Sequence, residues 1–134
     1  MARLLFQFLI FIFLPLQAQY SVVIKTEKLR NNNGTIFWEL TDEHQARIAG
    51  GIQNIENNTC IISIKNIQKG KYIFKYFHDE NCNNKLDKNC LGIPTEGFGF
   101  SNNAKGSFGP PETGKTIFKI ENDTLLIYHP TYYL

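Results

Sequence analysis

Short oxygen-bearing side chains recur at alternate positions in one stretch of this 134-residue chain. They are Asp79, Asn81 and Asn83, followed after a longer step by Asp87. Carboxylate and amide oxygens in a tight turn are the hard ligands that Ca²⁺ prefers, and the spacing follows the start of the calcium-loop pattern D-x-[DN]-x-[DN]-G. The stretch therefore predicts a calcium-binding loop, with candidate ligand positions at Asp79, Asn81, Asn83, Lys85, Asp87 and Glu96.

The stretch departs from an EF-hand at its last ligand position. The closing bidentate Glu of that pattern would fall at Cys90, and no helical periodicity flanks the loop. Asp87 or Glu96 would have to replace the missing ligand, so we expect weak affinity, on the order of 10⁻⁴–10⁻³ M. The alternative is an Asx-rich turn whose side chains bond to their own backbone without any metal.

Two of the three cysteines bracket the same loop. In an oxidising compartment we expect a disulfide between Cys82 and Cys90, which would stabilise the fold by about 2–3 kcal/mol in the chain-entropy model. Cys60 alternates with Ile62 and Ile64, which predicts a buried free thiol. The cysteine pattern does not favour a zinc site.

The start of the chain has the layout of a secretory signal peptide. A short basic start with Arg3 precedes an apolar run over residues 4–14, and Pro15 and Ala18 follow. The run is shorter than the roughly 20 residues of a membrane span. We therefore predict a signal peptide over residues 1–18 and one domain over residues 19–134, exported to the periplasm or secreted, with no transmembrane segment after cleavage.

The charge balance excludes one class of partner. Removal of the signal peptide takes away one Arg and no acid, so the formal net charge falls from +2 to +1. The chain has no run of basic residues accompanied by exposed aromatic residues, which nucleic-acid binding requires. We therefore expect no nucleic-acid partner.

Short β-branched and aromatic runs separated by Asn, Gly and Pro predict an all-β fold. Asn33-Gly34 predicts a hairpin turn, and residues 41–55 are expected to form a long connection with one short strand. We expect an antiparallel two-sheet sandwich of about seven strands, immunoglobulin-like or transthyretin-like in outline. Besides the short strand within 41–55, the predicted strands are 21–26, 35–40, 59–65, 71–78, a short piece at 98–101, and a closing hairpin of 115–120 with 123–128.

His78 ends a strand in which Tyr72, Phe74 and Tyr76 share its face. That position is typical of a structural histidine that holds the loop by hydrogen bonding. The alternative is a metal-dependent, hydrolase-like enzyme that uses His78 with neighbouring carboxylates such as Glu96. If His78 and Glu96 faced a common open pocket, the enzyme hypothesis would be favoured, whereas burial of both side chains would exclude it.

A segment rich in Gly and Phe follows the loop. Glycine next to phenylalanine lets the backbone pack closely on aromatic rings, which predicts an ordered loop. Its rings either close one end of the sandwich as a hydrophobic plug or form an exposed platform for a small ligand or glycan. The candidate partner surface consists of Phe98, Phe100, Asn102, Asn103 and Phe108.

Four motifs in this part of the chain are specific. They are Gly70-x-Tyr72, His78-Asp79-Glu80-Asn81-x-Asn83-x-Lys85-Leu86-Asp87, Leu91-Gly92-Ile93-Pro94-x-Glu96-Gly97-x-Gly99-Phe100-Ser101-Asn102-Asn103-Ala104 and Phe108-Gly109-Pro110-Pro111. Together they resemble the DUF2141 family of exported bacterial proteins, whose function is unknown, and the resemblance covers roughly residues 21–128. It implies an exported β-sandwich in a Gram-negative cell and carries over no catalytic residue. Cys82 and Asn84 stand where that family usually has glycine, and Cys90 where it usually has an apolar or aromatic residue.

Taken together, these patterns predict a non-enzymatic module that binds an envelope protein or a glycan. Its loop would be stiffened by Ca²⁺, by the disulfide or by both, and would present the Gly/Phe segment to the partner. The remaining alternatives are the hydrolase-like enzyme and a purely structural component of the envelope.

Overall fold

The computed structural model describes residues 12 and 14–133. Most of the predicted signal peptide therefore lies outside the described residues. Residues 14–18 are exposed and carry no regular structure, and the first strand begins at Gln19. Within the described part of the chain, no helix is long and apolar enough to cross a membrane.

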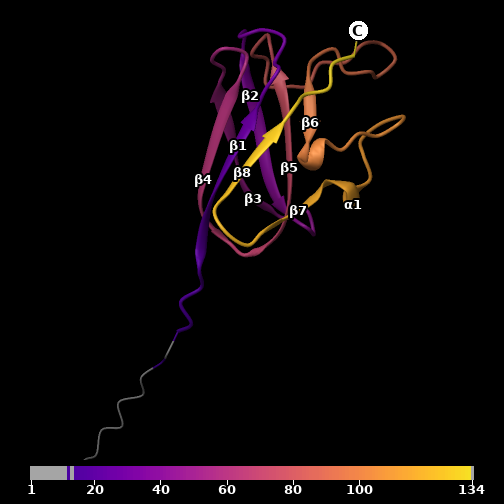
Figure 1. The fold of residues 1–134 in the computed structure, drawn as a ribbon. Helices are drawn as coiled ribbons and strands as arrows, with labels where there is room; N and C mark the ends of the chain where they lie inside the picture. The colour runs from indigo at the N-terminus through magenta and orange to yellow at the C-terminus, as the bar shows by residue number, and fades with distance from the viewer. Residues whose placement is uncertain (1–11, 13, 134) are drawn as a thin grey trace, which may run out of the picture.

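Two mainly antiparallel sheets enclose one hydrophobic core (Figure 1). The three-stranded sheet has the order β4-β1-β8, and the five-stranded sheet has the order β3-β2-β5-β6, with β7 paired to β5 next to a different stretch of that strand. The predicted all-β class with two sheets is confirmed, with eight strands among the described residues; the immunoglobulin-like or transthyretin-like outline stays a prediction. The elements are β1 (Gln19–Thr26), β2 (Thr35–Asp42), β3 (Arg47–Asn54), β4 (Cys60–Gln68), β5 (Gly70–Asp79), β6 (Phe98–Phe100), η1 (Ser101–Asn103), α1 (Thr113–Thr116), β7 (Ile117–Ile120) and β8 (Thr124–Tyr128).

Alternation along the strands decides which side chains enter the core. On β2, Ile36 and Leu40 are fully buried, and on β4 Cys60 is buried as predicted. Phe74 of β5 is fully buried, and its ring lies 6.0 Å from that of Tyr128 on the opposite sheet. Because successive side chains of a strand point to opposite faces, the intervening residues of β2 and β5 form the outer face of the five-stranded sheet.

The predicted closing hairpin is wrong. β7 pairs with β5, whereas β8 pairs in parallel with β1, so residues 121–123 carry the chain from one sheet to the other. Ile120 and Tyr128 are both buried, so each strand contributes to the core from its own sheet. A turn signal such as Glu121-Asn122 marks where the chain reverses, but the pairing partner depends on contacts with distant strands.

The Asn33-Gly34 hairpin is also wrong, because β1 and β2 belong to different sheets. Residues 41–55 contain a longer strand than expected, since β3 runs over eight residues and pairs with β2. Asp42 explains this local reversal: its Oδ1 accepts the backbone N–H groups of His44 and Ala46 at 2.9 and 2.8 Å and closes the turn.

Candidate functional site

The loop over residues 80–97 joins two neighbouring strands of the five-stranded sheet. β5 ends at Asp79, and β6 begins at Phe98 and pairs antiparallel with β5. The chain therefore leaves and re-enters the sheet at one place. The C-terminal segment passes the same end, because Phe98 and Thr131 exchange backbone hydrogen bonds (Figure 1).

Two buried carboxylates hold this loop. Asp79 is fully buried; its Oδ1 accepts the N–H of Asn83 at 3.1 Å, and its Oδ2 accepts the N–H of Asn84 at 2.8 Å. Glu96 is 5 % exposed and accepts the N–H groups of Glu80 at 2.8 Å and Asp87 at 3.1 Å. Each carboxylate thus accepts hydrogen bonds from two backbone donors of the loop.

The surface side of the loop carries the remaining predicted ligand positions. Asp87 accepts the side-chain amides of Asn81 at 2.6 Å and Asn83 at 2.8 Å. The side-chain oxygen of Asn81 accepts the backbone N–H of Asn83, and the side-chain oxygen of Asn83 accepts the backbone N–H of Lys85. The loop is therefore arranged as an Asx-rich turn, and calcium binding by it stays a prediction.

This arrangement limits what the six predicted ligand positions can offer a cation. The oxygens of Asp79 and Glu96 are buried and already accept backbone hydrogen bonds. The side chains that a cation can reach are Asp87 and the amides of Asn81 and Asn83. No group of three or more His, Cys, Asp or Glu side chains within the described residues has a geometry that could hold a metal ion.

Cys82 and Asn84 adopt the left-handed backbone conformation, with φ of +58° and +65°. These are the two positions at which the resemblance expects glycine, and glycine is the residue that reaches this region without steric cost. Cys82 and Cys90 are exposed free thiols in this structure, and their predicted disulfide stays a prediction. Cys60 is a buried free thiol, as expected, and burial raises its pKa to about 11.

His78 is fully buried and bonded at both ring nitrogens. Nε2 lies 2.7 Å from the carbonyl oxygen of Asn33, and Nδ1 lies 2.9 Å from the hydroxyl of Tyr132. A carbonyl can only accept, so Nε2 carries the proton, and in the neutral ring Nδ1 accepts from Tyr132. His78 and Glu96 are both buried, so they do not meet in an open pocket.

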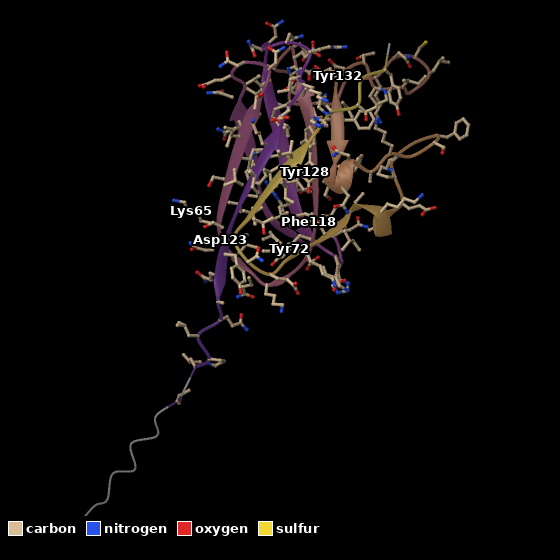
Figure 2. The ribbon with its side chains drawn as sticks, viewed as in Figure 1. Lys65, Tyr72, Phe118, Asp123, Tyr128 and Tyr132 are labelled. Carbon is tan, nitrogen blue, oxygen red and sulfur yellow. The ribbon has the colours of Figure 1, made fainter. Side chains whose placement is uncertain are left out.

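Tyr132 and Arg30 extend this network and were not predicted from the sequence. The N–H of Arg30 donates to the Tyr132 hydroxyl at 3.1 Å, and the Arg30 guanidinium lies 4.7 Å from the centre of the Tyr132 ring. The two residues are 102 positions apart in the chain, which no local pattern reveals. Figure 2 shows Tyr132 at the end of the sandwich where the loops gather.

The same cluster contains an ion pair. Arg30 donates from Nε to Glu80 at 2.6 Å, and Asn31 donates to the other oxygen at 3.0 Å. Burial acts against the charged form, but the hydrogen bonds from Asn31 and Arg30 and the charge of Arg30 hold the pKa of the Glu80 carboxyl below its usual value. Burial also raises the pKa of Tyr132. Gly97 permits this packing, because a Cβ there would overlap the Tyr132 ring.

A row of apolar side chains crosses the outer face of the five-stranded sheet. Phe37 on β2 lies opposite Phe77 on β5, which lies opposite Phe98 on β6. The rings of Phe37 and Phe77 are stacked 5.1 Å apart with an interplanar angle of 10°. The row lines a hollow of about 430 Å³ together with Leu86, Phe100 and the charged residues Glu39, Lys75 and Arg47.

A second hollow of about 440 Å³ adjoins the first, and the two share Leu86, Phe98 and Phe100. We call the two hollows together the aromatic groove. The second hollow lies between residues 86–94 and residues 107–110, with Phe108 on its rim and completely exposed. The groove contains three of the predicted partner residues, and alternation along β2 and β5 was the signal that could have added Phe37 and Phe77.

Asn102 and Asn103 lie outside the lining of the aromatic groove. The side-chain amide of Asn102 donates to the carbonyl oxygens of Lys115 and Ile117. Asn103 accepts the N–H of His129 at 2.8 Å. Both amides therefore connect η1 to the segments around β7 and β8.

The fold and this site define an exposed aromatic groove on a small two-sheet β domain, beside a loop held by buried carboxylates. A family model described as "Uncharacterized protein conserved in bacteria (DUF2141)" matches residues 24–127. The match spans most of the chain, and the chain belongs to this family, as its motifs indicated. A comparison with curated proteins gave no match.

Replacement of Glu96 by Gln tests the role of the buried carboxylates. Gln offers one acceptor and turns an NH₂ group toward one of the two backbone donors, so we expect a loss of about 1–3 kcal/mol in the free energy of unfolding. Urea denaturation measures it. The exposed Glu112→Gln is the matched control, with an expected change within about 0.5 kcal/mol. Equal effects of the two changes would contradict the proposed role.

Replacement of Cys82 by Gly tests the strain of the left-handed turn. A side chain in this region costs roughly 1–2 kcal/mol, and the added freedom of glycine offsets part of it. We expect the variant to be about 0.5–1 kcal/mol more stable in urea denaturation with a reductant present. Cys90→Gly is the control, because Cys90 is not among the residues with positive φ. It should lose stability, and a gain there would contradict the explanation.

Proposed function

We propose that the chain is an exported, non-enzymatic β-sandwich module of the bacterial envelope that binds a partner through the aromatic groove. The row formed by Phe37, Phe77 and Phe98 carries this proposal. The outer face of an antiparallel sheet usually presents polar side chains to water. A contiguous apolar surface at that place supports a binding site.

An extended apolar segment of a partner protein fits the groove better than a glycan. The rings of Phe37 and Phe77 are stacked on each other, so each has at most one face left on which a sugar ring could stack. Apart from the aromatic residues Trp38, Tyr76 and Tyr133, the lining side chains with polar groups are Glu39, Arg47, Lys75, Lys88 and Ser107. Glu39 already pairs with Lys75 at 2.6 Å, which leaves few directed hydrogen bonds for sugar hydroxyls.

In this proposal the loop serves as scaffold for one wall of the groove. Leu86 lines both hollows, and its neighbour Asp87 is fixed by the Glu96 carboxylate and by two asparagine amides. Ordered loop residues reduce the entropy lost on binding. The hydrogen-bonded turn would thus preorganise the groove before a partner arrives.

The hydrolase-like alternative finds less support. It requires His78 and a carboxylate to face a common pocket, whereas His78 and Glu96 are both buried and bonded to neighbouring groups. Neither residue lines the aromatic groove. A binding role for the groove therefore stays our first proposal, and a purely structural envelope component is the remaining alternative.

Export and the disulfide belong to the same proposal. The layout of residues 1–18 supports secretion to the periplasm or beyond in a Gram-negative bacterium. In that oxidising compartment Cys82 and Cys90, both exposed, would be free to pair across the loop. Such a bond would stiffen the wall of the groove that Leu86 forms.

Calcium is proposed only as a weak ligand of this loop, through Asp87 and the amide oxygens of Asn81 and Asn83 after their amides rotate. With a dissociation constant of about 1 mM, calcium at about 10 mM would stabilise the fold by roughly 1.4 kcal/mol and raise Tm by about 6 °C. Thermal melts of the wild type and of Asp87→Asn measure this. An unchanged Tm of the wild type would contradict the calcium hypothesis and would not affect the groove proposal.

Site-specific photo-crosslinking tests the groove. A benzoylphenylalanine at position 86 or 100 should capture one discrete protein from an envelope extract, because both side chains line the two hollows. The same probe at Leu125, an exposed position on β8 of the other sheet, is the control. Peptide mapping should place the captured contact in an apolar segment. Capture of a glycan, or the same product from Leu125, would contradict the proposal.

A further inference from the structure

The outer face of the three-stranded sheet carries exposed apolar side chains of its own. Ile61 on β4 is 56 % exposed, and Leu125 and Ile127 on β8 are 63 % and 46 % exposed. Val23 on β1, the central strand, is half-buried and belongs to the same face, because its neighbours in the chain point into the core. None of these residues lines the aromatic groove, which lies on the other sheet.

The register of the strands arranges this face in rows. In one row Lys25 of β1 lies between Ile61 of β4 and Ile127 of β8. In the next row Val23 lies between the only serine of β4 and Leu125. Both edge strands therefore contribute apolar side chains, and the central strand contributes one apolar and one charged residue.

A third row has a cation at one edge and a carboxylate at the other. Lys65 of β4 and Asp123, which directly precedes β8, both lie beside Ser21 of β1, and Asp123 accepts the N–H of Ser21 at 2.8 Å. Figure 2 shows Lys65 and Asp123 at the end of the sandwich away from Tyr132. Both are exposed, and neither forms an ion pair within the described part of the chain. A backbone N–H is neutral, so Asp123 keeps its full charge.

We propose that this face packs against the same face of a second copy of the chain, around a two-fold axis parallel to β1. That rotation places β4 of one copy over β8 of the other, because β1 lies between them. Lys65 then meets Asp123 of the second copy, and symmetry repeats the contact. In the apolar rows Ile61 meets Ile127 of the second copy, and the two Val23 side chains meet at the axis.

The charge pattern favours a second copy over a different partner. Lys65 and Asp123 stand at opposite edges of one row, so a two-fold rotation pairs each with its opposite. A different protein would have to present the same two charges in the reverse order. The face therefore complements itself without any further residue.

Lys25 is the charged residue nearest to the axis, and its charge is already balanced. Its Nζ lies 2.7 Å from Oε1 of Glu27, and both side chains are partly buried. The hydrogen bond from Lys25 holds the pKa of the Glu27 carboxyl below its usual value. The two copies thus bring together two neutral pairs rather than two free cations.

The size of the face sets the strength of the contact. Its three strands have five to nine residues each and form a face smaller than the roughly 800 Å² per partner of a standard interface. We therefore expect a weak dimer, with a Kd of about 10–100 µM. In such a dimer the aromatic grooves of the two copies face outward on opposite sides. The dimer goes beyond the binding function of the groove and does not depend on it.

Sedimentation velocity tests the dimer. The protein starting at Gln19, where β1 begins, is used so that the apolar start of the chain cannot itself associate. We expect a monomer at about 1 µM and conversion to a dimer by about 500 µM. A protein that stays monomeric over this range would overturn the proposal.

Charge exchange tests the two-fold geometry. Lys65→Glu alone and Asp123→Lys alone should each weaken association at least tenfold, because each brings like charges together at two places. An equimolar mixture of the two variants should associate as the wild type does, since both contacts of the mixed dimer then join opposite charges. No recovery in the mixture would overturn the two-fold arrangement.

Serine substitutions test the apolar rows. Leu125→Ser with Ile127→Ser should weaken association at least tenfold. Ile48→Ser with Ile52→Ser, at 47 % and 55 % exposure on β3 of the other sheet, is the matched control and should associate as the wild type does. Tm values confirm that each variant is folded. Equal losses in the two double variants would overturn the assignment to this face.

Failure of the dimer is distinguishable from failure of the groove. The cross-links from positions 86 and 100 capture a different protein, whereas a product formed through a probe at Leu125 would contain two copies of this chain. The monomeric Lys65→Glu variant should keep the cross-links from positions 86 and 100. Their loss together with the dimer would overturn the independence of the two surfaces.

Discussion

The organisation of this end of the molecule depends on two carboxylates that are buried and bonded to backbone N–H groups. A buried charge without partners is very unfavourable, but Asp79 and Glu96 each accept two such donors. Asp79 closes β5 and Glu96 stands two residues before β6, so these bonds fix where the chain leaves and re-enters the sheet. The loop between them is ordered as a consequence.

The C-terminal residues Thr131 and Tyr132 stabilise the same end of the sandwich, where β5 ends and β6 begins. Tyr132 bonds to His78 at the end of β5 and to Arg30 before β2, and Thr131 pairs with Phe98 of β6. Residues from three distant parts of the chain thus meet around one buried histidine. The network also orders the aromatic groove, because Phe98 and Leu86 line both hollows and belong to the segments that the network holds in place.

Local pattern sufficed to predict the faces of the strands but not their partners. Alternation placed Phe74, Tyr76 and His78 on one face of their strand, and the structure buries that face. The two hairpins at Asn33-Gly34 and Glu121-Asn122 were wrong, because these turns carry the chain between sheets and pairing is decided by distant strands. The contact of Arg30 with Tyr132 could not be predicted for the same reason.

The alternation of Asp79, Asn81 and Asn83 shows why residue type alone cannot separate a metal site from a hydrogen-bonded turn. Both need short side chains with oxygens close to the backbone, and both tolerate left-handed residues such as Cys82 and Asn84. Burial makes the distinction. A ligand oxygen must be reachable by the cation, whereas Asp79 and Glu96 are enclosed and turned toward N–H groups, so their charges stabilise the loop itself. What this loop then presents to a partner is Leu86, the apolar residue beside Asp87, which lines both hollows of the aromatic groove.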